Sequence, residues 1–166
     1  MSFWARAAAR RLRYEALRKI RREIGADWIA LAHHLDDQAE TVLMHLIRGT
    51  GLKGLGGIMP VSGNVIRPML SVTRQEVEAF LEEWCLSHIE DSSNETDQFL
   101  RNRLRHHIVP QLKKENPSLS QNLSAMALRL RQDEEALDAP MDFSQGLPVE
   151  TLRALPEARR SRVIAS

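Results

Sequence analysis

The sequence predicts an α/β fold, in which part of a parallel sheet is followed by a helical segment. Apolar residues recur at three- and four-residue steps over residues 4–24, 37–48 and 73–84, which predicts helices. Short apolar runs rich in β-branched residues, at 28–32 and 65–66, lie between them and suit buried strands of a parallel sheet. Alternation of helices and strands indicates helical crossovers. Because only two strands are visible, we expect a sheet that is incomplete by itself.

Local signals set the boundaries in the first half of the chain. Gly25 is a natural stop for the first helix, and a strand over residues 28–32 follows the turn. Asp37 and Glu40 form a capping-box pattern, which predicts that the next helix begins there. The expected helix over residues 37–48 would therefore start directly after the strand.

A glycine-dense segment separates the two halves. Residues 49–63 hold six of the eight glycines and predict a loop, after which Val65-Ile66 reads as the second strand. Thr73 and Glu76 form a second capping box, which opens the helix that runs to Trp84.

The rest of the chain is predicted to be mainly helical. Residues 87–97 are polar and predict a loop, in which Ile89 could form a short strand. A helical pattern covers residues 99–115, and Pro110 is expected to break or kink it. A further helix is expected from residue 117 to about residue 136, and prolines then interrupt regular structure.

The charge is distributed unevenly, although the net charge of the 166 residues is only +1. Between Arg6 and Arg22, eight cationic residues stand against Glu15 alone. A second basic cluster consists of Arg101, Arg103, Arg105, His106, His107, Lys113 and Lys114. Such local basic surfaces fit a polyanionic partner, and solvated helix faces would give the same pattern.

Cysteine content and hydropathy exclude several protein classes. Cys85 is the single cysteine, so the sequence has no disulfide framework and no cysteine-based zinc site, which fits a reducing cytoplasm. No apolar run is long enough to span a bilayer, and no apolar signal core follows the Arg-rich start. We therefore expect a cytoplasmic location and no membrane partner.

The strongest motif is His33-His34-Leu35-Asp36-Asp37-Gln38-Ala39-Glu40-Thr41. It lies between a strand's carboxyl end and a helix's amino end, where ligands of open α/β sheets bind. Adjacent carboxylates can hold magnesium, free N–H groups of the helix favour phosphate, and imidazoles can bind phosphate or transfer protons. The alternative is that Asp36 and Asp37 only cap the helix.

Two weaker motifs follow. In the segment from Arg48 to Gly57, glycines would let the backbone approach a ligand and Arg48 could clamp phosphate; the alternative is a flexible connection. Arg101 and Arg105 share a helical face and could grip phosphate together; the alternative is a solvated face paired with the acidic loop before it.

Taken together, these segments resemble the tRNA(Ile)-lysidine synthase family. The matching strings, in order, are Ala9-Arg10-Arg11-Leu12-Arg13-Tyr14, Ala32 to Thr41, Leu46 to Leu52, Ile66-Arg67-Pro68-Met69-Leu70, Glu90-Asp91-Ser92-Ser93-Asn94, Arg101 to His106, and Asn116-Pro117. Each string is modest evidence, whereas the ordered set over residues 4–130 is specific.

The resemblance implies an N-type ATP pyrophosphatase of the PP-loop superfamily, with an adenine nucleotide alpha hydrolase-like, Rossmann-like sheet. Residues 1–116 would form the later part of this catalytic domain, and residues 117–166 a helical linker and the start of a tRNA-binding region. The implied reaction is a carbon–nitrogen ligation. ATP adenylates the C2 oxygen of the wobble cytidine of tRNA(Ile), and the ε-amine of lysine then displaces AMP. ATP, Mg²⁺, lysine and tRNA(Ile) are the implied partners, and a homodimer stays open.

The resemblance also assigns roles to residues. Asp36 and Asp37 would lie near magnesium or near the attacking amine, and His33 would contact the ATP phosphates or the transition state. The remaining implied ATP- or substrate-binding residues are His34, Arg48, Gly49, Thr50, Gly51, Arg101 and Arg105. A carboxylate near the amine could take its proton, because only the neutral amine attacks.

One departure from the family pattern is the absence of its Ser-Gly-Gly-x-Asp-Ser phosphate loop, which the family places before the position where this chain starts. We therefore expect a truncated chain that neither binds ATP tightly nor catalyses alone; micromolar, magnesium-dependent ATP binding in a calorimetric titration would contradict this.

Two rival functions stay open. One is a metal-dependent phosphohydrolase that binds its metal through His33, His34, Asp36 and Asp37, with His88 or Asp91 as further ligands. The other is a non-catalytic tRNA-binding fragment that uses the two basic helices. A sulfur-transferring relative of the superfamily is disfavoured, because such enzymes often need paired cysteines.

Overall fold

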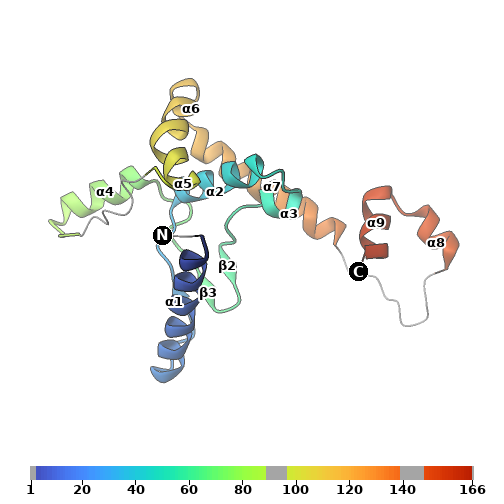
Figure 1. Cartoon of the computed structure of the whole chain (residues 1–166), viewed down its shortest axis with the longest axis horizontal. Helices are drawn as coiled ribbons and strands as arrows, with labels where there is room; N and C mark the ends of the chain where they lie inside the picture. Colours follow the sequence, from blue (N-terminus) through green and yellow to red (C-terminus); the bar gives the residue numbers. More distant parts are fainter. Residues whose placement is uncertain (1–2, 89–96, 139–147, 166) are drawn as a thin grey trace.

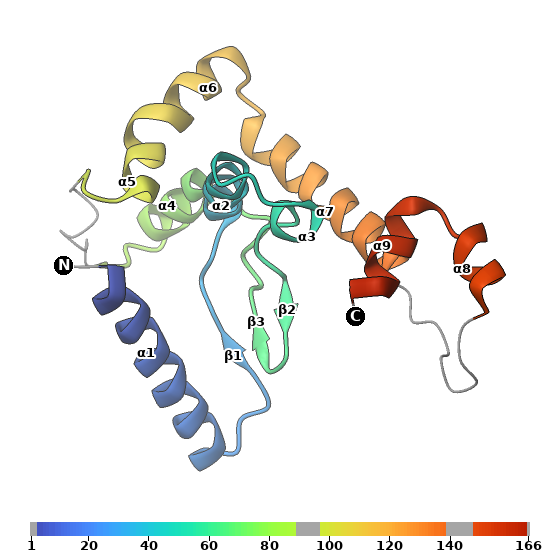
Figure 2. The ribbon, with the colours of Figure 1, turned by 45° about the vertical axis from the view of Figure 1, so that its right-hand side comes forward.

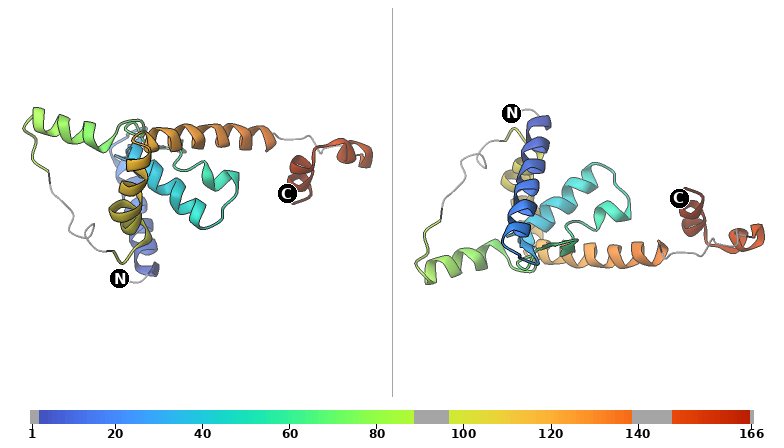
Figure 3. Two further views of the ribbon diagram at one scale, coloured as in Figure 1. Left: turned by 90° about the horizontal axis from the view of Figure 1, so that it is seen from above. Right: turned by 90° about the horizontal axis from the view of Figure 1, so that it is seen from below.

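The chain folds around one central helix, as a computed structural model of residues 3–88, 97–138 and 148–165 shows (Figure 1). That helix is α2 (Leu35–Ile47), which packs mainly against α7 (Leu119–Leu137). Helix α4 (Arg74–Glu83) and helix α7 extend from this region in opposite directions (Figures 1 and 3). The functional residues discussed below gather at the amino end of α2.

The other elements are short apart from the first helix. They are α1 (Phe3–Glu23), β1 (Ile29–Ala30), α3 (Leu52–Leu55), β2 (Val61–Ser62), β3 (Val65–Ile66), α5 (Leu100–Arg103), a π-helical turn (Leu104–Ile108), α6 (Val109–Glu115), α8 (Val149–Ala154) and α9 (Glu157–Ala165).

The sheet is small and mixed. Strand β1 pairs in parallel with β3, with Ile29 opposite Val65, and β2 pairs antiparallel with β3 as a hairpin. The parallel pair and its helical crossover confirm the expected α/β arrangement, but the sheet is not purely parallel, because the expected loop over residues 49–63 contains α3 and β2. Figure 2 shows β1 running up into α2, which places the start of α2 at the carboxyl end of the parallel pair.

The capping of α2 differs from the sequence prediction. The helix begins at Leu35 rather than Asp37, so that His34 is its N-cap. The His34 Nδ1 atom accepts a hydrogen bond from the Asp37 backbone N–H (3.3 Å), and Asp37 Oδ2 accepts one from the His34 backbone N–H (3.1 Å). The expected Asp37–Glu40 capping box was therefore wrong, and the Glu40 side chain takes no part in the cap. The Thr73–Glu76 box at the start of α4 is confirmed.

Pro110 disturbs its helix as expected, but on the amino-terminal side. Pro110 has no N–H to donate to the residue four positions earlier, and the backbone just before it widens into the π-helical turn Leu104–Ile108. In that turn the Val109 N–H bonds to the Leu104 carbonyl, five residues back. Helix α6 continues beyond it, so the proline shifts the register of the helix without ending it.

The buried apolar cluster lies where α2 meets the π-helical turn and α6. It contains Leu43, Leu104 and Val109, and partly buried side chains of α7 pack against it. The packing of α7 crosses the expected boundary between residues 116 and 117, which stays a prediction. Beyond Asp138 we expected prolines to interrupt regular structure; Pro148 directly precedes α8, and Pro156 lies between α8 and α9.

The Glu90-Asp91-Ser92-Ser93-Asn94 motif and the short strand expected at Ile89 lie outside the described residues. Within the described ranges, no helix combines the length and the apolar character needed to cross a membrane.

Candidate functional site

The site begins with Asp36, in the first turn of α2. Its Oδ1 accepts hydrogen bonds from Lys113 Nζ (2.6 Å) and from Ser120 Oγ (2.7 Å), and its Oδ2 accepts one from the Arg74 backbone N–H (3.0 Å). Burial opposes ionisation, but these donors outweigh it and lower the pKa of Asp36 to about 2. Asp36 is therefore ionised at neutral pH and is a very weak base.

The neighbouring Asp37 belongs to a separate ionic network. Its Oδ1 accepts from Arg101 Nη2 at 2.7 Å and from Arg105 Nη2 at 3.2 Å. The same two arginines bind Glu40, through Arg101 Nε (2.7 Å) and Arg105 Nε (2.6 Å). The Glu40 side chain is only 3% exposed. Hydrogen bonding to Glu40 raises the pKa of Arg105, and burial opposes that rise.

His33 lies just before α2 and is partly buried. Its Nδ1 is buried and has no hydrogen-bond partner among the described residues. Burial lowers the pKa of His33; Asp37 opposes this, whereas the positive charges of Arg67, Arg101 and Arg10 lower the pKa further. At neutral pH the imidazole is therefore uncharged and can accept a proton or donate one hydrogen bond.

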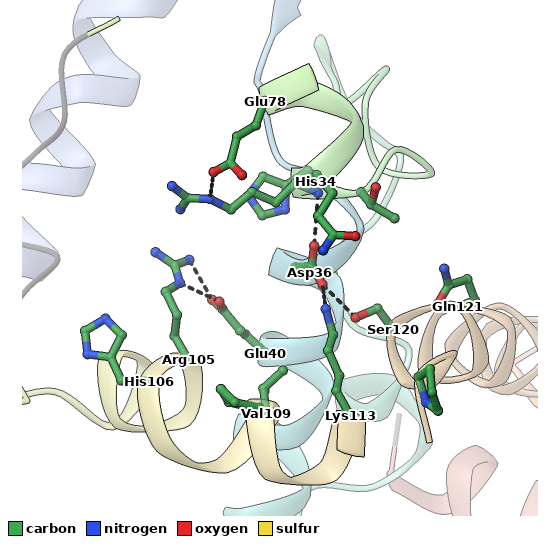
Figure 4. Close-up of a pocket in the computed structure, with 15 residues that line it drawn as sticks. His34, Asp36, Glu40, Glu78, Arg105, His106, Val109, Lys113, Ser120 and Gln121 are labelled. Carbon is green, nitrogen blue, oxygen red and sulfur yellow. Dashed lines mark hydrogen bonds and ion pairs between the residues drawn. The ribbon is translucent and has the colours of Figure 1, made fainter. Parts of the chain in front are cut away.

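A cavity of about 490 Å³ opens beside these groups (Figure 4). Figure 4 shows Asp36 between Lys113 and Ser120, and Glu40 facing Arg105. Residues from four separate segments line this cavity: His34, Asp36, Glu40, Thr73, Arg74, Gln75, Glu78, Arg105, His106, Val109, Pro110, Lys113, Pro117, Ser120 and Gln121. Charges of both signs in one cavity suit a ligand that carries both phosphate and ammonium groups.

The structure brings together one part of the predicted site and separates the other. His33, His34, Asp36, Asp37, Arg101 and Arg105 gather at the amino end of α2. Arg48, Gly49, Thr50 and Gly51 lie at its carboxyl end, and the 13 residues of α2 separate the two groups by about 20 Å. Arg48 is exposed there, and Gly49 has a φ of +68°. None of these four residues lines the cavity, which is lined by His34, Asp36 and Arg105 of the first group and not by its other members.

The acidic pair does not fit a shared magnesium ion in this arrangement. Successive helical side chains point about 100° apart, and Asp36 and Asp37 bind different sets of cations. All four of their carboxylate oxygens already accept hydrogen bonds from protein donors. Among the residues that the structure describes, no three His, Cys, Asp or Glu side chains form a metal-binding group.

Sequence reasoning missed several residues of the site. Glu40 was assigned to a cap, and its position three residues after Asp37, on the same helical face, was the available signal. Lys113 was only counted in a basic cluster. Ser120 and the Arg74 backbone N–H gave no signal, because only the folding of α7 and α4 against α2 brings them to Asp36.

Comparison with known proteins gives the family context. Residues 4–112 match the family described as "PP-loop domain". A tRNA(Ile)-lysidine synthase from Porphyromonas gingivalis (strain ATCC BAA-308 / W83) is 46% identical over 134 residues, which are 80% of this chain and 28% of that protein. The enzyme of the same name from Geobacter sulfurreducens is 41% identical over 170 residues, 94% of this chain and 36% of that protein. The chain thus spans about a third of the length of these relatives.

A solved structure shares the fold. It is a U34-tRNA thiolase from Methanococcus maripaludis with its [4Fe-4S] cluster, and it matches with a TM-score of 0.61 and 23% identity. The match covers 78% of this chain and 44% of the thiolase chain. At this identity the likeness concerns the fold alone.

Proposed function

This chain belongs to the PP-loop domain family, and we propose that it carries part of the catalytic site of a tRNA(Ile)-lysidine synthase. The proposed reaction is the ATP-dependent ligation of lysine to C2 of the wobble cytidine of tRNA(Ile). One observation carries the proposal: the acidic pair of α2 and two arginines from a distant segment converge beside a cavity at the carboxyl end of β1.

In this proposal the reaction has two steps. The C2 oxygen of the cytidine attacks the α-phosphate of ATP, and pyrophosphate leaves. The ε-amine of lysine then attacks C2, AMP leaves with that oxygen, and the amine gives up its proton.

The residues divide these tasks by charge. Arg101 and Arg105, fixed by Asp37 and Glu40, present positive charge to phosphate groups without having to reorganise during the reaction. Asp36 holds the Lys113 ammonium beside the cavity, and its pKa of about 2 makes it a poor proton acceptor. His33 is the other candidate acceptor, because burial keeps its imidazole neutral and its Nδ1 is unpaired within the described chain.

The distal residues have a different place in the proposal. Arg48, Gly49, Thr50 and Gly51 lie about 20 Å from the acidic pair, so they would contact the tRNA rather than the reacting groups. The metal-dependent phosphohydrolase loses support, because its four expected ligands form no metal-binding group in the described structure.

Lysine incorporation tests the function. The gene product that contains this sequence is incubated with tRNA(Ile) transcript, ATP and radiolabelled lysine, and acid-precipitable label is counted. We expect ATP-dependent incorporation, reduced about 100-fold by Asp37→Asn, which removes one of the two carboxylates that hold both arginines.

The matched control is Glu82→Gln, which changes an exposed carboxylate on α4. It should incorporate lysine at the wild-type rate. Absence of lysine incorporation by the wild-type protein, under conditions where a known lysidine synthase is active, would overturn the proposal.

A further inference from the structure

The cationic side chains of helix α1 fall into two groups, those that pair with a carboxylate and those that do not. Arg11 pairs with Glu15 (3.5 Å) and Lys19 pairs with Glu23 (3.7 Å), so these charges are compensated. Within the described chain, no ion pair joins Arg10, Arg18 or Arg22 to a carboxylate. These three positive charges are therefore uncompensated among the described residues.

Two of the uncompensated cations, Arg10 and Arg18, lie near the ring of Tyr14, the single tyrosine of the chain. The Arg10 and Arg18 guanidinium carbons lie 5.5 Å and 5.9 Å from the centre of the Tyr14 ring. Residues 10, 14, 18 and 21 follow helical spacing and share one face. Alternation of arginine with an exposed or half-buried aromatic ring is typical of surfaces that bind nucleic acid strands.

The same face continues into a cavity of about 340 Å³. This cavity lies between the end of α1 and the turn of the β2–β3 hairpin, and its lining includes Arg18, Arg21 and Arg22 but no carboxylate side chain. Arg21 Nη1 donates to the backbone carbonyls of Ala26 and Asp27, at 3.3 Å and 3.2 Å. Arg21 Nε is buried without a partner among the described residues, and an anion in the cavity would provide one.

The face connects this cavity with the candidate catalytic site. Arg10, at its other end, lies close enough to His33 for its charge to contribute to the lowered pKa of that imidazole. From Arg10 to Arg22 the helix rises about 18 Å. Figure 2 shows α1 approaching β1 toward its carboxyl end, with the hairpin beyond β1.

We propose that Arg10, Arg18, Arg21 and Arg22, with Tyr14, form an arginine face that binds the phosphate backbone of an RNA strand. The strand would run from the catalytic cavity toward the β2–β3 hairpin. This proposal rests on the proposed function for the identity of the RNA, which would be tRNA. The arginines neutralise successive phosphates, and Tyr14 offers its ring to one base.

Two double variants of this chain test the face. One is Arg10→Gln/Arg18→Gln, and the control is Arg13→Gln/Lys19→Gln, because Arg13 and Lys19 lie outside the face. Both remove two positive charges from α1, so a general charge effect changes both equally. Circular dichroism checks that each variant keeps its helix content.

Binding is measured by fluorescence anisotropy with a labelled anticodon stem-loop RNA over a series of salt concentrations. We expect the face variant to bind at least tenfold more weakly and to reduce the slope of log affinity against log salt by about 2. The control should stay within about twofold of wild type at each salt concentration. Equal weakening of both variants, or of neither, would overturn the proposal.

Tyr14 gives a second readout. Tyr14→Ala should weaken binding about fivefold through loss of stacking, whereas Tyr14→Phe, which keeps the ring, should bind like wild type. Wild-type affinity in Tyr14→Ala would remove the base-stacking part of the proposal.

A lysine-incorporation assay distinguishes a failure of the arginine-face proposal from a failure of the proposed enzymatic function. In the gene product that contains this sequence, the face variant should raise the KM for tRNA. An unchanged KM with active enzyme would reject the arginine face alone. RNA binding through this face by a protein that incorporates no lysine would reject the enzymatic function alone.

Discussion

The two ends of α2 differ in how strongly the rest of the chain fixes them. At the amino end, Asp37 and Glu40 bind two arginines that lie 61 to 68 residues away in sequence. At the carboxyl end, Arg48 is exposed, and among the described residues Thr50 bonds to the nearby His45 carbonyl (3.2 Å). The comparison suggests that preorganised charge lies at the amino end, and that the other end is free to adapt to a large partner.

The far end of the glycine-rich segment that follows α2 is held by hydrogen bonds to side chains of α2 and α7. Gln38, which is fully buried, accepts a hydrogen bond from the Ile58 backbone N–H at 2.6 Å. Arg131 of α7 donates to the Gly56 and Ile58 carbonyls, each at 2.9 Å. The expected flexible connection is therefore held at its far end, and the exposed part is confined to its beginning.

The largest expected effect comes from breaking the amino-end network with Glu40→Gln. The substitution keeps the shape of the side chain but leaves Arg101 and Arg105 without their most buried partner. We expect the free energy of unfolding to fall by about 3 to 4 kcal/mol. Urea denaturation measures this, with Glu83→Gln on α4 as an exposed control; a midpoint equal to that of the control would show that the network does not stabilise the fold.

Gly57→Ala tests whether the glycine-rich segment is truly fixed. Gly57 has a φ of +66°, and an added Cβ would lie 2.7 Å from the buried Gln38 Oε1. Both strain and loss of the Gln38–Ile58 bond should lower stability by about 2 to 3 kcal/mol.

Gly63→Ala is the matched control for Gly57→Ala. It has a φ of +55° with nothing within 4 Å of the added Cβ, so only backbone strain of about 1 kcal/mol applies. Equal losses in the two variants would mean that contact with Gln38 is unimportant.

Asp36→Asn tests how the amino end of α2 contributes to the pH dependence of stability. The pKa of Asp36 is lowered from 3.8 to about 2 in the folded protein, so its carboxylate stabilises the fold above about pH 4 and loses this effect as pH falls through about 2. This lowering of the pKa corresponds to about 2 kcal/mol, because one pKa unit is worth about 1.4 kcal/mol. The side chain is only 15% exposed, so solvent screens the interaction little.

Urea midpoints measured between about pH 4 and about pH 2 should therefore fall more steeply in wild type than in Asp36→Asn. The exposed Asp133→Asn serves as the control and should follow wild type. Parallel curves for wild type and Asp36→Asn would contradict the low pKa.

Arg48→Ala should have the smallest effect on stability, within about 0.5 kcal/mol, because the side chain is exposed. In the gene product that contains this sequence, it should raise the KM for tRNA while leaving the kcat of pyrophosphate release at saturating tRNA unchanged. A large loss of stability would show that the carboxyl end of α2 is as strongly fixed as the amino end.

Local patterns were enough to predict most elements of the fold. Apolar spacing identified α1, α2, α4 and α7, and the Thr73–Glu76 cap was read correctly from the sequence. The prediction failed where the signal was not local. Strand β2 forms only by pairing with β3, inside a segment whose glycines predicted a loop.

By itself the sequence determined the residue types of the site and their order, because motifs preserve chemical groups and spacing along the chain. Only the tertiary structure decided which groups meet. It joined Ser120 and Lys113 to Asp36, assigned Arg101 and Arg105 to Asp37 and Glu40, and left Arg48 at the far end of α2. The physical reason is that ion pairs and hydrogen bonds act over a few ångströms, and packing of distant helices sets those distances.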